Sequence, residues 1–278
     1  PNPSPSSIED FSANDIFELN NLGLGERKLS RRTVSGIMLT LLLMGMLMYT
    51  FNVQPAKAES KIWIVDDDGS ADFHKIQEAI NVAHVGDTIY VHEGTYYEHL
   101  TVNKDNLTLI GENPETTIID GSGNGTIVYL IANNVNITGF TIQKCGVEGM
   151  GFHLEGAHNN NITGNIITDN NAAIYIADSY SNLVNFNIIT NNIEGIDIQC
   201  DGNIIQNNVM VRNRLFGIQL WGADNNLVAN NTITNNEDGI MIKNECYNST
   251  IKDNTIAVNE YGIQMFESRG NIVYHNNF

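Results

Sequence analysis

Residues 230–242 read NNTITNNEDGIMI, and close variants of this phrase return along the second half of the chain. The recurring core is a small residue, an aliphatic residue, any residue and a second aliphatic residue. It occurs as GFHL at Gly151, AIYI at Ala173, GIDI at Gly195, GIQL at Gly217, GIMI at Gly239 and GIQM at Gly262. The step between copies is 22 or 23 residues. A constant step of this size indicates a solenoid in which each repeat forms one coil.

Asparagine marks further registers of the same repeat. One register contains Asn165, Asn187, Asn208, Asn231, Asn254 and Asn277, and a second contains Asn170, Asn192, Asn213, Asn236 and Asn259. A weaker third register contains Asn161, Asn182, Asn203, Asn226, Ser249 and Asn271. Asn tolerates the left-handed backbone of a sharp bend, and its amide can bond to an Asn on the next coil. We therefore interpret these registers as structural ladders at the corners of the coils.

The apolar residues predict three short strands in each coil. They alternate with polar residues at period 2, and no helical pattern of twelve residues occurs within a repeat. Burial of five or six aliphatic side chains cannot offset the ordering of 22 residues in an isolated coil, so coils must stack. The predicted fold is all-β, a parallel β-helix with coils of about 22 residues.

The first part of the domain follows a looser pattern. Strands are predicted at 61–65, 88–91, 100–102, 107–110, 117–119, 127–131 and 135–142. Residues 73–83 predict a short capping helix over the first coil, with Asp72 as its N-cap. The other end has no such cover, and the chain stops at HNNF in mid-repeat. We therefore expect a C-terminally open domain that continues in a longer protein.

Three segments are predicted along the chain. Residues 1–32 are a non-structural or mis-started N-terminal tail, 33–58 a signal peptide or signal anchor, and 59–278 the β-helix domain. Residues 33–51 carry no charge, and the small-x-small triplet 56–58 that follows them is typical of a cleavage site. The pattern predicts a secreted or cell-surface protein that contacts the membrane only through this segment, if the segment is not cleaved.

Composition excludes several partners. The net charge is −18, and residues 59–278 contain 27 Asp and Glu against 9 Lys and Arg without a basic cluster. Nucleic acids and anionic membrane surfaces need clustered cations, so neither is an expected partner. Cys145, Cys200 and Cys246 lie far apart and form no CxxC motif. An odd number of widely spaced cysteines predicts no disulfide framework.

The motifs resemble a known family. Residues 62–102 and LTLIGE at 107–112 resemble the N-terminal part of secreted right-handed β-helix proteins. The later N-x-I-x-x-N-x-I and G-I-x-I units resemble the NosD-type domain, which has a pectin-lyase-like fold. The resemblance covers residues 60–278 and implies a right-handed helix. It does not fix an activity, because this repeat serves surface proteins, sugar-binding and sugar-cleaving domains, and NosD, a periplasmic accessory of copper-site assembly.

One face of the predicted helix is a candidate binding face. Outward positions beside the GxIxI core form two rows, which give the candidate residues His153, Glu155, Tyr175, Asp197, Gln219 and Trp221. Exposed Trp and Tyr near carboxylates can stack on and hydrogen-bond a saccharide. We expect a polysaccharide or cell-surface glycan as the partner. The alternative is that a loop or another protein covers the aromatic side chains.

Catalysis is an alternative function, as a polysaccharide lyase or glycoside hydrolase. A hydrolase needs two carboxyls about 5–9.5 Å apart, and Glu155 and Asp197 lie two coils apart. However, the Asn-Thr-Asp strand, the Asp pair and the Gly-His-Gly of the family's hydrolases are absent. Lyases use Ca²⁺ and a basic residue, and no Arg falls on the candidate face. No catalytic residue is therefore assigned.

Metal binding is the third alternative, and it would make the protein a NosD-like copper accessory. Copper favours His and Met clusters, but the seven His of this chain show no tight spacing motif. The run Asp66-Asp67-Asp68-Gly69-Ser70 offers carboxylates to Ca²⁺, although a turn explains it equally well. Ca²⁺ and copper are thus named as candidates without an assigned site.

Overall fold

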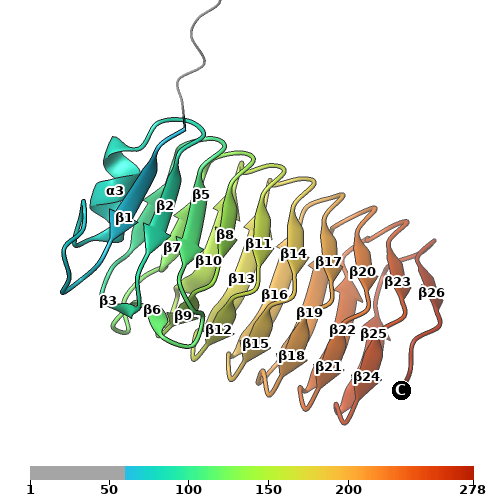
Figure 1. Ribbon diagram of the computed structural model, residues 1–278. Coiled ribbons are helices and arrows are strands. Elements are labelled where there is room, and N and C mark those ends of the chain that lie inside the picture. Colours follow the sequence, from blue (N-terminus) through green and yellow to red (C-terminus); the bar gives the residue numbers. More distant parts are fainter. Residues whose placement is uncertain (1–59) are drawn as a thin grey trace, which may run out of the picture. The chain divides into compact units, whose positions relative to one another are not determined.

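The computed structural model describes residues 60–278, which belong to one compact unit, Glu59–Phe278. The chain winds as a right-handed parallel β-helix, and its coils stack along one axis (Figure 1). The predicted fold class is confirmed. The predicted tail at 1–32 and signal peptide or anchor at 33–58 fall outside the described residues. Within 60–278, no helix is both long and apolar enough to cross a bilayer.

Three parallel sheets, called A, B and C, run along the helix. Sheet A has ten strands: β1 Ile62–Val65, β2 Thr88–Val91, β5 Thr108–Gly111, β8 Asn136–Thr138, β11 Asn161–Thr163, β14 Leu183–Asn185, β17 Ile204–Gln206, β20 Leu227–Ala229, β23 Thr250–Lys252 and β26 Ile272–Tyr274. Sheet B has eight strands: β3 Gly94–Tyr96, β6 Thr117–Asp120, β9 Thr141–Gln143, β12 Ile166–Thr168, β15 Ile188–Thr190, β18 Val209–Val211, β21 Thr232–Thr234 and β24 Thr255–Ala257. Sheet C has eight strands: β4 Leu100–Val102, β7 Val128–Leu130, β10 Met150–Glu155, β13 Ala172–Ala177, β16 Glu194–Gln199, β19 Phe216–Trp221, β22 Asp238–Lys243 and β25 Tyr261–Met265.

The early strands largely match the predicted ones, with two differences. The single strand expected at 135–142 is two strands, β8 and β9, because the chain turns between sheets at Gly139, whose φ is +81°. Strand β3 was not predicted, since the sequence GTY gives too short a run for the period-2 pattern. Strands of sheet C from β10 to β22 also have six residues, longer than expected.

A short helix, α3 at Ile76–Val82, packs against β1, β2 and β4 at the N-terminal end (Figure 1). The predicted N-cap was wrong. Asp72 instead accepts a hydrogen bond from the Ile64 N–H, because residue 73 still pairs with the first strand. The Glu98 carboxylate accepts from the backbone N–H groups of Ile76 and Gln77 at 2.8 and 3.0 Å. The next part of the chain thus caps the helix, which is a role that local sequence cannot reveal.

Aliphatic side chains from all three sheets form one continuous core. Phe152, Ile174, Ile196, Ile218 and Ile240 are fully buried on sheet C. The residue that precedes each of these aliphatic residues must be small, because the backbones of adjacent coils approach closely at that position. A Cβ added at Gly195 would lie 2.1 Å from the carbonyl oxygen of Gly217. The three cysteines are free and buried among these apolar residues.

Buried asparagines connect successive coils at the corners. The Oδ1 of Asn208 accepts from the backbone N–H of Asn187 at 2.9 Å and from its Nδ2 at 3.0 Å. The Nδ2 of Asn208 in turn donates to Asn231 at 3.1 Å. The same bonds join Asn165 to Asn187, Asn231 to Asn254, and the series Asn192, Asn213, Asn236 and Asn259, whereas Asn170 bonds to Asn192 through its backbone N–H alone.

Two ladders differ from the predicted registers by one residue. Asn254 bonds to Asn276 and not to Asn277, and the third ladder begins at Asn160 in place of Asn161. The residue that bends the chain is also not the residue that forms the ladder bonds. Positive φ occurs one position before the ladder residue, as at Asn191 (57°) before Asn192 and Asn230 (56°) before Asn231. The Asn pairs in the sequence therefore divide two tasks, since the first residue bends the chain and the second bonds the coils.

Val258 occupies such a bend with φ of +59° and is 77% exposed. A left-handed backbone costs a β-branched residue about 1–2 kcal/mol, and Asn adopts it more readily. We expect Val258→Asn to raise the free energy of unfolding by about 1 kcal/mol, measured by urea denaturation. Val258→Ala is the control and should give a smaller gain. An equal gain in both variants would show that surface hydrophobicity, and not backbone strain, sets the effect.

Candidate functional site

A hollow of about 330 Å³ lies on the outer face of sheet C. It spans three adjacent strands, β16, β19 and β22. Its floor runs from the first to the last residue of β19, which is roughly 17 Å for a six-residue strand. The side chains that line it are mostly acidic, amide or aromatic, and they include Glu194, Asp197, Gln199, Phe216, Gln219, Trp221, Asp238 and Lys243.

Asp197 lies near the middle of the hollow and is only 6% exposed, although it points away from the core. Its carboxylate accepts hydrogen bonds from the Nε2 of Gln219 at 2.8 Å and the Nε2 of Gln199 at 3.1 Å. Burial raises the pKa of Asp197 above its usual range, and the two amide donors oppose this only in part. A buried carboxyl with a raised pKa is characteristic of functional sites.

A second row crosses the same strands at the position before each glycine. Phe216 on β19 is in register with Asp238 on β22, and Glu194 occupies the equivalent position on β16. Burial raises the pKa of Glu194 and of Asp238, and neighbouring carboxylates raise both further. This end of the hollow is therefore an aromatic ring between two carboxyl groups.

The other end of the hollow is formed by Trp221 and Lys243. The Trp221 ring is 42% exposed, and the Lys243 Nζ lies 4.4 Å from the ring centroid. The two residues are register partners at the ends of β19 and β22. An exposed tryptophan in a polar hollow offers an apolar face to a ligand and a ring N–H to a polar group.

The six predicted binding residues all lie on the outer face of sheet C, but they separate into two groups. Asp197, Gln219 and Trp221 line the hollow. His153 and Tyr175 instead belong to an aromatic row, with ring centroids of Tyr129, His153 and Tyr175 5.2 and 5.1 Å apart along the coils. Glu155 bonds to the Tyr129 hydroxyl at the edge of that row. This row adjoins the hollow because His153, Tyr175 and Asp197 are consecutive in register.

Four residues of the hollow were not predicted from the sequence, namely Glu194, Phe216, Glu237 and Asp238. A signal was present, because Glu194, Phe216 and Asp238 each precede the small residue of a GxIxI unit at steps of 22 residues. Simple alternation from the inward residues would turn that position toward the core. The strand departs from this alternation at the glycine, whose missing Cβ faces the neighbouring coil.

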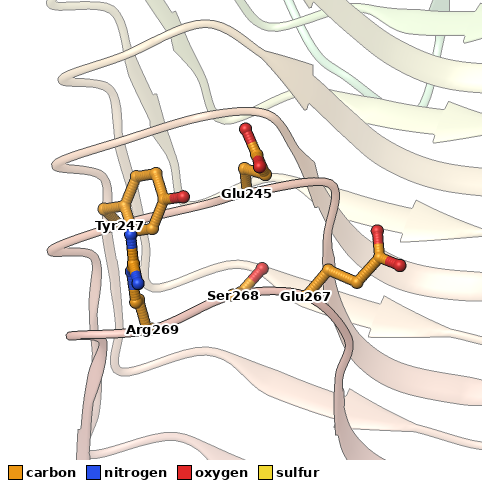
Figure 2. A pocket seen from close by; sticks show the side chains of 5 residues that line it. All are labelled: Glu245, Tyr247, Glu267, Ser268 and Arg269. Carbon is orange, nitrogen blue, oxygen red and sulfur yellow. The ribbon is translucent and has the colours of Figure 1, made fainter.

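A larger hollow of about 570 Å³ lies near the last coils and is lined by Glu245, Tyr247, Glu267, Ser268 and Arg269 (Figure 2). Tyr247 and Arg269 lie together there, with the guanidinium carbon 5.3 Å from the ring centroid. All five residues are exposed or half-buried, so this hollow contains no buried polar group with a fixed position. We therefore favour the hollow on sheet C as the candidate site.

Comparison with known proteins identifies the family of this chain. The family described as "Periplasmic copper-binding protein (NosD)" matches residues 80–278. The chain belongs to the NosD family. Among curated proteins, a probable pectinesterase/pectinesterase inhibitor 23 of Arabidopsis thaliana is 33% identical over 105 residues, which cover 34% of this chain and 18% of that protein. The match thus spans less than a fifth of the relative's length.

Solved structures share the fold of this NosD-family chain. An alginate lyase from Paenibacillus sp. has a TM-score of 0.55 at 17% identity, over 78% of this chain and 99% of that one. XylC in complex with xylose has a TM-score of 0.61 at 12% identity, over 76% and 68%. Pectate lyase Pel9A has a TM-score of 0.57 at 15% identity, over 70% and 63%. At these identities the likeness shows the pectin-lyase-like fold alone.

No cluster of His and Cys that would suit the copper of the family's description occurs among the described residues. Copper favours thiolate, thioether and imidazole ligands. Burial raises the pKa of Cys145, Cys200 and Cys246, which keeps each thiol protonated, and each contacts a backbone carbonyl. Within 60–278, the one group of three His, Cys, Asp or Glu with converging ligand atoms is Asp66, Asp67 and Asp68. Carboxylates are hard ligands, so this group does not suit copper.

The same three aspartates were the candidate Ca²⁺ ligands. Their oxygens lie within 4.8 Å of one another. The Asp66 carboxylate also accepts from the Asp68 N–H at 3.3 Å, and a Cβ at Gly69 would lie 1.9 Å from one of its oxygens. These contacts describe a tight turn, and exposed acidic turns are common without a metal. Ca²⁺ binding here stays an untested prediction.

The raised pKa of Asp197 has a measurable consequence. Because the pKa is higher in the folded state, ionisation of Asp197 costs stability as the pH rises through that pKa, and the cost is absent below the unfolded pKa of about 3.9. We expect Asp197→Asn to be more stable than the natural protein at pH 7, and this difference should disappear near pH 3. The measurement is urea denaturation at both pH values. A variant that is less stable at pH 7 would contradict the raised pKa.

Proposed function

We propose that this protein is a carbohydrate-binding β-helix protein that acts outside the cytoplasm. A saccharide would lie in the hollow on sheet C, with a sugar ring against Trp221 and its hydroxyls toward the amides and carboxylates. The observation that carries this proposal is the placement of an exposed Trp221 in one hollow with the buried, hydrogen-bonded Asp197. Saccharide recognition needs both features, an apolar face for the ring and fixed polar partners for the hydroxyls.

The polar partners of the hollow are held in place before any ligand binds. Gln199 donates to Asp197 and accepts from the Tyr175 hydroxyl at 3.0 Å, and Gln219 donates to Asp197. These side chains stand on paired strands of a rigid sheet. Preorganised groups lose little conformational entropy on binding, which favours affinity.

The comparisons support this function and the location. The names of the neighbouring structures refer to an alginate lyase, a pectate lyase and a complex with xylose, so proteins of this fold act on or bind saccharides. The family is described as periplasmic, and the sequence of residues 33–58 predicts export. Binding is preferred to cleavage here, since the hollow contains none of the catalytic motifs of the family's hydrolases.

A glycan array probed with the full chain tests the proposal. We expect binding to at least one saccharide class, and we expect Trp221→Ala to weaken that binding at least tenfold, because tryptophan in a pocket is a typical hot spot. Tyr97→Ala is the matched control, since Tyr97 is 71% exposed but lies on an early coil. The proposal fails if no saccharide binds, or if both variants bind as the natural protein does.

A further inference from the structure

The hollow on sheet C contains carboxyl groups without matching cations. Four acidic residues line it: Glu194, Asp197, Glu237 and Asp238. Lys243 is the one basic residue in its lining, and its ammonium lies over the Trp221 ring. Among residues 60–278, no Lys, Arg or His forms an ion pair with these four carboxylates. The hollow therefore contains more acidic than basic groups, and the charge of Lys243 offsets them only in part.

Asp238 has an unsatisfied oxygen in this site. The residue is 6% exposed, and its Oδ1 is buried with no hydrogen-bond partner in the described protein. A buried acceptor without a donor is unfavourable, and a donor from an ion, water or ligand is one way to satisfy it. A ligand that brings a donor to Asp238 would remove this penalty.

The neighbours of Asp238 indicate the kind of donor. Phe216 lies beside it in register, and Glu194 occupies the same position on the other side of β19. A cation between the two carboxyl groups would contact the ring face and both of them, and it would favour their ionised forms against the burial that raises their pKa values. An ammonium group also supplies several N–H donors, which suits the free Oδ1 of Asp238.

We propose that this end of the hollow binds the ammonium group of an amino sugar, between Glu194 and Asp238 and against Phe216. This proposal rests on the proposed carbohydrate binding and specifies the class of sugar. Trp221 would hold a sugar ring at the opposite end of β19. Uronate polymers would be excluded, because their carboxylates would face four acidic side chains and one lysine.

Isothermal titration of the full chain at pH 6 with three short probes tests this selectivity. The probes are a chitosan trisaccharide with free amines, the fully N-acetylated trisaccharide and a trigalacturonate. We expect the free-amine sugar to bind at least tenfold more tightly than the N-acetylated one, and trigalacturonate to bind most weakly. Asp238→Asn has the same shape without the charge, and it should reduce the tenfold preference to threefold or less.

Matched variants separate the site from the overall charge of −18. Glu115→Gln removes an exposed charge on an early coil and should leave the preference intact. If Asp238→Asn does not fold, as judged by its circular dichroism, Glu194→Gln takes its place. The amino-sugar proposal is overturned if the free-amine and N-acetylated probes bind equally well. It is also overturned if the preference for the free amine persists in Asp238→Asn or Glu194→Gln. Either result leaves the proposed carbohydrate binding intact. Failure of all three probes to bind overturns this proposal, and the glycan array then decides the broader one.

Discussion

The structure depends on hydrogen bonds between buried asparagines of successive coils. At each corner the chain turns through a left-handed residue, and its backbone N–H groups must find partners without water. The next ladder residue supplies them, as Asn208 does for Asn187, and it uses its own amide on the following coil. Burial of aliphatic side chains favours the stacking of coils, but the ladders set the position of each coil relative to the preceding one.

This arrangement leaves the outer face of sheet C free for function. Core packing, corner bends and ladder bonds are all satisfied by inward or corner residues, which repeat from coil to coil. The outward residues of β16, β19 and β22 do not repeat, and they form the one place in the described sheets where buried carboxyls, amides and an exposed tryptophan share a hollow. The raised pKa of Asp197 means that the fold tolerates a group that destabilises it at neutral pH.

Much of the fold could be predicted from the sequence because its interactions have a fixed period. The GxIxI units gave the register of sheet C, and the Asn registers gave the ladders to within one residue. What failed were interactions between distant residues, such as the capping of α3 by Glu98. Asp197, Gln219 and Trp221 of the site followed from alternation along the strands. Glu194, Phe216 and Asp238 did not, because the strand departs from alternation at the glycine that follows each of them.

Buried ladder asparagines, and not asparagine content as such, hold the coils in register. Urea denaturation of Asn208→Leu tests this role, because leucine has a similar volume but leaves the N–H of Asn187 without an acceptor and its Nδ2 with the Ile162 carbonyl alone. We expect a loss of about 2–4 kcal/mol in the free energy of unfolding. Asn235→Gly, at an exposed left-handed corner, should change it by less than about 1 kcal/mol. Equal effects of the two substitutions would show that the ladder bonds do not hold the coils in register.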